Sequence, residues 1–255
     1  MQVVVQLIVR EIEARYRGSL LGLLWSFLTP LFMLAVFTFV FAVVFRARWP
    51  GQEETSLRDF ALILFAGLTT FNLFGEVFGR APTLVTAQPN LVKKVIFPLH
   101  VLPVVALGSA LFQTAVSLVV LFGFQVTVGS GFHPAILLAP LLLLPLALFS
   151  LGLAWFIAAF GVYVRDIGQV IAPLTTALMF LSPVFYPASA LPEWIRPLAT
   201  YSPIAFSIET VREAVIFGRL PAAASFAVAT AAGIVVAGLG LAFFQKTRKG
   251  FADVL

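Results

Sequence analysis

The stretch from Gly18 to Phe45 holds 28 residues without a single Asp, Glu, Lys or Arg. At about 1.5 Å per residue, a helix of that length exceeds the roughly 30 Å hydrocarbon core of a bilayer. The apolar region of a secretory signal is only about 7–15 residues long, so we expect a permanent membrane anchor. Arg15 and Arg17 precede the run and place its start on the cytoplasmic side. Gly18 and Gly22 have the small-residue spacing that lets a second helix approach closely.

The composition is that of a polytopic membrane protein. The 255 residues are 61% hydrophobic and only 11% charged, with a mean hydropathy of +1.05, whereas soluble domains are about 25% charged. The absence of Cys excludes a thiolate metal site. A net charge of +5 would favour nucleic-acid binding in a soluble protein, but here the positive-inside rule accounts for it, and we expect no nucleic-acid partner.

Further apolar stretches complete a prediction of an all-α protein with six transmembrane helices in one domain, 1–255. These helices are expected at 19–45, 60–79, 99–126, 135–162, 169–186 and 222–244. The 70 residues from 95 to 164 lack charge and are too long for one span, and TVGSGFHP at 127–134 marks a turn between two. With both termini cytoplasmic, ten basic and four acidic residues fall inside and six of each fall outside, the sign that the positive-inside rule requires.

Small residues in the later spans predict close helix packing. The fourth span has Ala154, Ala158 and Gly161, and the sixth has Gly233, Gly238 and Gly240.

Residues 3–17 predict an amphipathic helix in the cytoplasmic membrane interface. Val5, Ile8, Ile12 and Tyr16 recur at helical spacing. Glu11 and Arg15 form an i,i+4 pair in the favourable order. A solvated leader without a specific role is the alternative. The candidate interface residues are Arg10, Glu13, Arg15, Tyr16 and Arg17.

Residues 80–98 form a second cytoplasmic segment, in which Gln88-Pro89-Asn90 predicts the start of a short helix and Pro98 its end. A short basic helix between prolines suits docking to a cytosolic partner, and a plain basic loop is the alternative. The candidate docking residues in 88–97 are Gln88, Asn90, Leu91, Lys93, Lys94 and Phe97. A tight cytoplasmic turn holds Arg165 and Asp166.

Residues 187–221 are too polar to span and too apolar for a plain loop. Ser202 reads as a helix N-cap, Pro203 as its first residue and Gly218 as its stop. We therefore expect short re-entrant or interfacial helices at 190–217 on the external face. The candidate residues of this region are Tyr201, Pro203, Glu209, Arg212 and Glu213.

Several kinds of chemistry lack their residues. No G-x-x-x-x-G-K-[ST] loop is present, so a nucleotide phosphate is not bound in that way. His100 and His133 are expected at opposite membrane faces, where they cannot share a metal. Glu76 is the only acid expected inside a span, which makes it a functional candidate by default. Pairing with Arg80, or reaching cytoplasmic water, is the alternative.

Aromatic residues are abundant, with 27 Phe, 4 Trp and 4 Tyr. Two stripes run along opposite sides of the first span, one made of Phe37, Phe41 and Phe45 and the other of Trp25, Phe32 and Phe39. Aromatic faces can stack against the C–H faces of sugars. Trp25, Phe32, Phe37 and Phe41 are therefore candidate contacts of a substrate channel, and packing against lipid is the alternative.

Four motifs, in this order along the chain, resemble those of ABC-2-type permeases that export polysaccharides. The first is Arg15, Tyr16, Ser19, Leu21, Gly22, Trp25 and Pro30, in an R-Y-x-x-S-x-L-G-x-x-W-x-x-x-x-P-like pattern. The others are VYVRDI with Tyr163, Arg165 and Asp166, SPVFYP at 182–187, and YSPIAFSIETVREAV at 201–215. The resemblance covers nearly the whole chain and agrees with the six-span prediction.

The resemblance implies a homodimer of this subunit with two cytosolic ABC ATPase subunits. ATP and Mg would bind to those partners, so the chain would have no cofactor and would not itself be an enzyme. It also implies export of a lipid-linked glycan, typically on undecaprenyl diphosphate, through a channel at the dimer interface. Residues 3–17 would be the interface helix, 91–97 the coupling helix and 201–217 the external gate.

Known substrates of such relatives include O-antigen, capsule and teichoic-acid polymers. The R-Y-R-G-S-x-L-G start is more similar to that of the O-antigen and teichoic-acid exporters. One rival is an ABC-2 exporter of drugs or small lipids. Another is a membrane enzyme acting on lipid-linked sugars, which needs converging acids, and only Glu209 and Glu213 are candidates.

Overall fold

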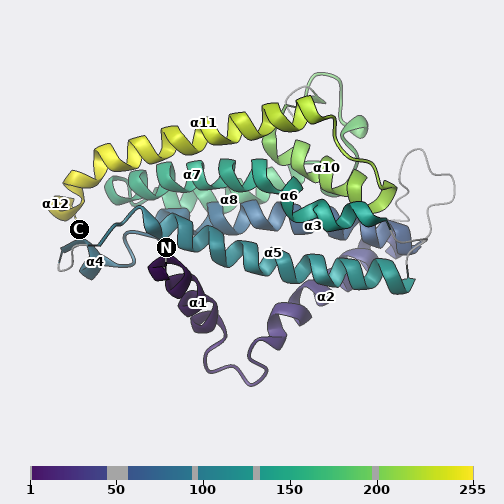
Figure 1. Cartoon of the computed structure of the whole chain (residues 1–255), viewed down its shortest axis with the longest axis horizontal. Helices are drawn as coiled ribbons and strands as arrows, with labels where there is room; N and C mark the ends of the chain where they lie inside the picture. The colour runs from purple at the N-terminus through teal and green to yellow at the C-terminus, as the bar shows by residue number, and fades with distance from the viewer. Residues whose placement is uncertain (1, 45–56, 94–96, 129–132, 197–200, 255) are drawn as a thin grey trace.

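The computed structural model describes residues 2–44, 57–93, 97–128, 133–196 and 201–254, and every regular element in these ranges is helical. Figure 1 shows an elongated bundle in which the long helices run side by side, with α1 and α2 set at an angle to it. The long elements are α1 (Gln2–Tyr16), α2 (Leu24–Thr38), α3 (Leu57–Arg80), α5 (Val101–Val128), α7 (Leu144–Tyr163), α8 (Ile167–Leu181), α10 (Pro203–Phe217) and α11 (Ala223–Thr247). The short ones are η1 (Phe39–Val44), η2 (Ala81–Thr83), α4 (Pro89–Lys93), η3 (Pro134–Leu138), α6 (Ala139–Leu142), η4 (Ala188–Ala190), η5 (Arg248–Gly250) and α12 (Phe251–Val254).

Five stretches of the described residues are long and apolar enough to cross a membrane. They are Leu24–Phe41, Asp59–Thr83, Val101–Thr127, Pro134–Tyr163 and Ala223–Val254. The remaining predicted span, the fifth at 169–186, corresponds to α8, which ends earlier than expected, at Leu181. Ser182 is extended, with a ψ of 152°, because the ring of the following Pro183 disfavours helical geometry at the residue before it.

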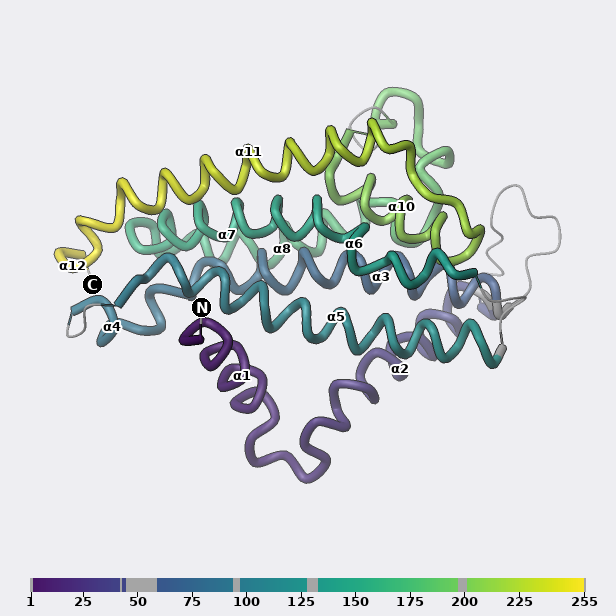
Figure 2. Tube along the Cα trace, in the orientation of Figure 1, coloured from purple at the N-terminus to yellow at the C-terminus, as the bar shows by residue number. Residues whose placement is uncertain are grey.

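The first span begins at Leu24 rather than at residue 19 because the chain turns between α1 and α2. Gly18 and Gly22 both have left-handed backbone, with φ of 83° and 50°, which a residue with a Cβ rarely adopts. Figure 2 shows that α1 and α2 form a V with this turn at its tip. The two glycines therefore lie in the turn and not on the helix that their small-residue spacing predicts, and no atom of the described residues lies within 4 Å of where their Cβ atoms would stand.

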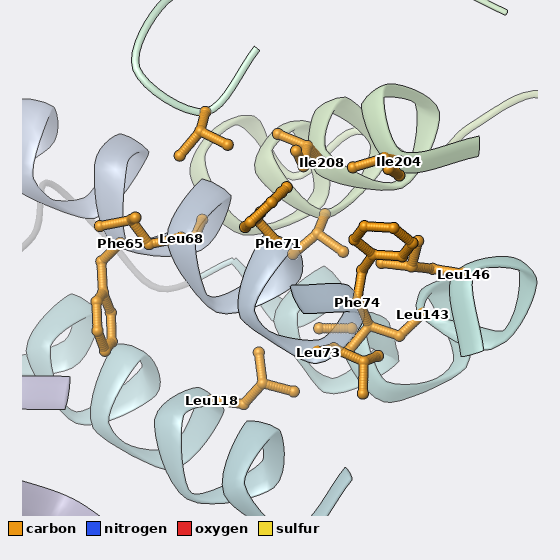
Figure 3. Close-up of a cluster of buried hydrophobic side chains, with 14 of the residues drawn as sticks. Phe65, Leu68, Phe71, Leu73, Phe74, Leu118, Leu143, Leu146, Ile204 and Ile208 are labelled. Carbon is orange, nitrogen blue, oxygen red and sulfur yellow. The ribbon is translucent and has the colours of Figure 1, made fainter. Parts of the chain in front are cut away.

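The central helix is α3, which packs against α2, α5, α7, α8 and α10. Figure 3 shows its Phe71 and Phe74 among apolar side chains from several of these neighbours, including Leu118, Leu143, Leu146, Ile204 and Ile208. Lipid tails are as apolar as these side chains, so close van der Waals packing stabilises such a bundle more than removal from water does.

Glycines allow α7 and α11 to pack backbone to backbone. A Cβ on Gly240 would overlap the carbonyl group of Gly152, and a Cβ on Gly233 would lie 2.8 Å from the carbonyl oxygen of Pro145. Gly161 of α7 has the same role against η2, since a Cβ on it would lie 2.7 Å from the carbonyl oxygen of Pro82. Gly238 does not contribute, contrary to expectation, because nothing lies within 4 Å of its Cβ position.

We therefore predict that Gly240→Ala destabilises the protein and that Gly238→Ala on the same helix does not. Added atoms in a tight contact typically cost about 1–3 kcal/mol, whereas Gly→Ala in an open part of a helix is neutral or stabilising by roughly 0.5–1 kcal/mol. The measurement is the midpoint of thermal aggregation in mild detergent. Equal midpoints for the two variants would contradict this packing.

Candidate functional site

A cavity of about 630 Å³ lies between α2, α3, α5 and α8, and residues of α1 complete its wall. Part of the lining is aromatic, from Trp25 and Phe37 of α2 and Phe65 and Phe71 of α3. The other part is polar and includes Thr69, Asn72, Glu76, Gln113, Thr175 and Thr176. The cavity therefore presents flat apolar rings and hydrogen-bonding groups together, in the region of the membrane-spanning helices.

Ion pairs between α1 and α3 hold the wall at the α1 end. Arg15 pairs with Glu76, and Arg80 pairs with Glu11. Arg80 Nη1 also lies 3.6 Å from Glu76 Oε1. The alternative role expected for Glu76, pairing with Arg80, is thus present, together with a second partner 61 residues away in sequence. Glu11 and Arg15 do not serve as a local helix pair, because each pairs with a residue of α3.

The charge of Arg15 is stable in this setting. Partial burial lowers its pKa, but the hydrogen bond and the negative charge of Glu76 raise it, and the net result is a pKa above the ordinary value. Arg15 therefore stays protonated at physiological pH. Two guanidinium groups and two carboxylates share this corner, so it carries no net charge.

Neutral hydrogen bonds extend the contact from α1 to α5 and α2. The hydroxyl of Tyr16 donates to Gln113 Oε1 at 2.9 Å, and Gln113 Nε2 donates to the Ser26 carbonyl oxygen at 2.9 Å. A Cβ on Gly108 of α5 would overlap Ile8, so the glycine lets α1 lie close. The other candidate interface residues are exposed: Arg10 and Glu13 on α1, and Arg17 just after its end.

The aromatic candidates of the first span divide into two groups. Trp25 and Phe37 line the cavity, whereas Phe32 is 65% exposed and does not line it. Phe41 stacks on Phe185 with ring centroids 4.9 Å apart, and Phe37 lies 5.5 Å from the same ring. The aromatic stripe of α2 and η1 is thereby joined to the SPVFYP segment that follows α8.

At the opposite end of the bundle, a buried arginine ties α10 to the turn after α8. Arg212 is 1% exposed, and its Nη2 donates to the carbonyl oxygens of Pro183 and Val184 at 2.7 and 3.1 Å. Its Nη1 donates to Glu209 Oε1 at 3.2 Å. A Cβ on Gly67 of α3 would lie 2.8 Å from Nη2, so a glycine is required beside the guanidinium.

Burial acts on both members of this pair. It lowers the pKa of Arg212 to about 10, partly offset by Glu209 and Glu213. It also raises the pKa of Glu209, against the lowering effects of Arg212 and of the backbone N–H of Ala188. Arg212 remains protonated at neutral pH. Glu209 accepts hydrogen bonds from Arg212 and from the backbone N–H of Ala188, and it thereby links α10 to the segment after α8.

The remaining candidates of this region lie at the surface or at helix ends. Tyr201 is 86% exposed, and Glu213 is 3.8 Å from Arg219 at the surface. Pro203 is the first residue of α10, Ser202 precedes it, and Gly218 ends it with a φ of 66°. Residues 197–200 lie outside the described ranges. The part of the predicted 190–217 region that precedes α10 is therefore only partly described.

The short helix α4 lies at the same end of the bundle as α12 (Figure 1). It covers Pro89–Lys93, which lies within the predicted range 88–97, and Lys94 falls outside the described residues. Its Leu91 and Val92, together with Phe97, pack against a cluster that includes Trp155, Phe244 and Phe251.

The polar residues around α4 are exposed, and the apolar residues beneath it are buried. Gln88, Asn90 and Lys93 are exposed, as are Arg165 and Asp166 in the turn before α8. Phe251 is fully buried, with its ring 5.5 Å from Phe244 and 5.9 Å from Tyr163. The C-terminal helix α12 thus supports α4 from inside and leaves its polar side chains free for a partner.

Among the described residues, no group of three or more His, Cys, Asp or Glu side chains is placed to hold a metal ion.

The family of this chain follows from its sequence match. The model of the family described as "ABC-2 type transporter" matches residues 2–216. The chain belongs to the ABC-2 type transporter family. As such a permease with several apolar helices, it is a multi-pass protein of the inner membrane.

Curated relatives match over nearly the full length. The chain is 30% identical to the O-antigen export system permease protein RfbA of Myxococcus xanthus, over 98% of this chain and 94% of the relative. It is 24% identical to the protein of the same name from Klebsiella pneumoniae, over 96% and 92%. It is also 24% identical to the polysialic acid transport protein KpsM of Escherichia coli, over 95% and 92%.

Sequence reasoning missed three features of this ABC-2 permease: the Arg15–Glu76 pair, the Tyr16–Gln113–Ser26 chain of hydrogen bonds, and the cavity-lining positions of Thr69 and Asn72 on α3. Only the first had a signal, since an acid inside a span requires a cation. Nothing local in the sequence identified Arg15 as that cation.

We predict that Glu76→Gln loosens α1 from the bundle, because Arg15 and Arg80 are left with one carboxylate between them. Losing a hydrogen bond to a charged group typically costs about 1.5–3 kcal/mol. Because the chain has no cysteine, disulfide formation between Ile8→Cys and Gly108→Cys reports the α1–α5 contact directly. The yield should fall with Glu76→Gln and should not change with the control Glu13→Gln, which is exposed on α1. Equal yields with and without Glu76→Gln would contradict the ionic anchor.

Proposed function

We propose that this chain is the membrane subunit of an ATP-driven ABC exporter that moves a lipid-linked polysaccharide of the O-antigen type, carried on undecaprenyl diphosphate. The observation that carries the proposal is the match to an O-antigen export permease at 30% identity over 98% of the chain. The cavity supports it physically, because its aromatic rings and uncharged polar groups fit a sugar chain.

In the proposed topology both termini are cytoplasmic and α8 is the fifth of six spans. The end of the bundle that holds α4 and α12 is the cytoplasmic end, where Lys246, Arg248 and Lys249 obey the positive-inside rule. The other end is external and holds α10 as part of a re-entrant gate. Arg212 keeps that gate attached to the end of α8.

The path for the polymer is proposed to form between two copies of the chain. The first span, α2 with η1, is mostly exposed in the single chain, and its uncovered side chains include Trp25, Phe32 and Phe39. A homodimer that places two such faces together would join the two cavities into one channel. Trp25 and Phe37 would then lie along the lumen.

The energy is proposed to come from two cytosolic ABC ATPase subunits, which would bind ATP and Mg. Their closure would push on residues 88–97. In the described part of this segment Gln88, Asn90 and Lys93 are exposed, and the apolar Leu91, Val92 and Phe97 pack inward. The push would then shift α2 and α8 and open the channel. This chain would bind no cofactor and would perform no catalysis.

A capsular polysaccharide is the second candidate cargo, and the similarity to the polysialic acid transport protein KpsM favours it. Teichoic acid remains an alternative from the resemblance of the first motif. A membrane enzyme is disfavoured because Glu209, one of its two candidate acids, bonds Arg212 and the backbone of Ala188.

The direct test is deletion of the gene, followed by analysis of lipid-linked glycans. Polymer on undecaprenyl diphosphate should accumulate inside the cell, and a co-purifying ABC ATPase should be recovered with the wild-type chain. Intact surface glycan after deletion, with sensitivity to drugs instead, would reject the proposal in favour of a drug exporter.

For the coupling role, we predict that reversing the charge of Lys93 and Lys94 to Glu reduces export by about tenfold or more, equivalent to about 1.4 kcal/mol of lost interaction. ATP hydrolysis by the partner should persist, because the ATPase site is not touched. The matched control is Lys246→Glu, a basic residue of the same end that lies on α11. Unchanged export in the Lys93/Lys94 variant would reject this role for the segment.

A further inference from the structure

The central helix α3 contains one residue that breaks its pattern of burial. From Phe60 to Phe78 the side chains are buried or half-buried, with the single exception of Asn72, which is exposed. The exception is a polar amide near the middle of a membrane-spanning helix. It lines the cavity rather than the lipid-facing side of the bundle.

Asn72 lies on a polar stripe that faces the cavity. Thr69, Asn72 and Glu76 are three and four residues apart, which places them on one side of α3, and all three line the cavity. Gly75 lies between them and adds no side chain to this wall. The stripe runs from the uncharged middle of the helix to the ion pairs at the α1 end.

Most polar groups around the cavity already have partners in the described residues. The hydroxyls of Thr114, Ser117, Thr175 and Thr176 donate to backbone carbonyls one turn earlier. Gln113 is bonded on both sides, to Tyr16 and Ser26, and Glu76 is paired with Arg15.

Thr69 and Asn72 differ from these groups. Thr69 is 2% exposed, and its hydroxyl has no hydrogen-bond partner among the described residues. The amide of Asn72 likewise makes no hydrogen bond there. A polar group left without a partner in an apolar medium costs several kcal/mol. The hydroxyl of Thr69 is enclosed by its neighbours, whereas the amide of Asn72 is exposed to the cavity, so it is Asn72 that requires water or a ligand there.

We infer that Asn72 is a binding site for the hydroxyl groups of a sugar chain midway across the membrane. The inference rests on the proposed function and adds a polar contact, on α3, to the path that the aromatic side chains of α2 line. An amide donates two hydrogen bonds and accepts two, and a sugar hydroxyl both donates and accepts. The amide can therefore bond neighbouring sugar hydroxyls in either direction as the polymer moves.

The charges of the cavity favour a neutral sugar ring at this position over a phosphate. The cation that lines the cavity, Arg15, is already paired with Glu76. A diphosphate beside Asn72 would have no free positive charge to neutralise it. A lipid tail or an apolar drug, in turn, would leave the amide of Asn72 unpaired.

The absence of cysteine makes accessibility directly measurable. Asn72→Cys, in the full complex in native membranes, should react with a charged methanethiosulfonate reagent. Leu73→Cys, the 1% exposed neighbour on the same helix, should not. Reaction at Asn72→Cys should be several-fold slower in cells that make the glycan than in cells lacking the first glycosyltransferase of its synthesis. No reaction at Asn72→Cys, or the same rate in both cells, would overturn the inference.

Substitution of the same side chain tests its role in transport. Asn72→Leu should insert normally, since an apolar residue suits a membrane helix, and should reduce glycan export by about tenfold. Asn72→Gln, which keeps the amide, should restore most of the export. Wild-type export by Asn72→Leu at equal protein level would overturn the inference without touching the proposed function, which fails only if deletion of the whole chain leaves export intact.

Discussion

The ion pairs between α1 and α3 are the interaction on which the cavity depends. An ionised carboxylate near the end of a membrane span is stable only beside a cation, and Glu76 finds two, Arg15 and Arg80. These pairs draw α1 across the bundle, where Tyr16 reaches Gln113 and Gln113 reaches the start of α2. The left-handed glycines of the turn then allow the chain to reverse into α2. Without this anchor, α1 would have little to hold it, since none of its residues is fully buried.

The opposite end of the bundle uses the same kind of device with a different partner. Pro183 follows the end of α8, and Arg212 donates hydrogen bonds to the backbone carbonyl oxygens of Pro183 and Val184. As a result, α10 and the end of α8 are held together. The charges of Glu76 and Arg212 are thereby held in ion pairs toward the two ends, and the cavity has an aromatic side and an uncharged polar side. A path of that character suits a neutral, hydroxyl-rich polymer, and it gives ATP-driven movements at one end a continuous set of helices to act on.

Hydropathy alone predicted where most of the long helices lie, because an uncharged run of about 20 residues has few other uses. Local signals located α10 from Ser202, Pro203 and Gly218. The features that the sequence did not predict depend on backbone conformation or on tertiary contacts. The α1–α2 turn requires left-handed backbone at Gly18 and Gly22, and hydropathy carries no information about backbone conformation. The Arg15–Glu76 pair joins residues 61 positions apart, and the partners of Arg212 are backbone carbonyls with no sequence signature. Asn72 could not be separated from other polar residues until the cavity around it was seen.

The measurement that tests the account most directly is an electron cryo-microscopy structure of the chain with its ATPase partner, trapped with a lipid-linked glycan in transit. The account predicts sugar density in the cavity bounded by α2, α3 and α8, against Trp25 on one side and Asn72 on the other. Density that bypasses this cavity, for instance along the lipid-facing surface of α11, would contradict it.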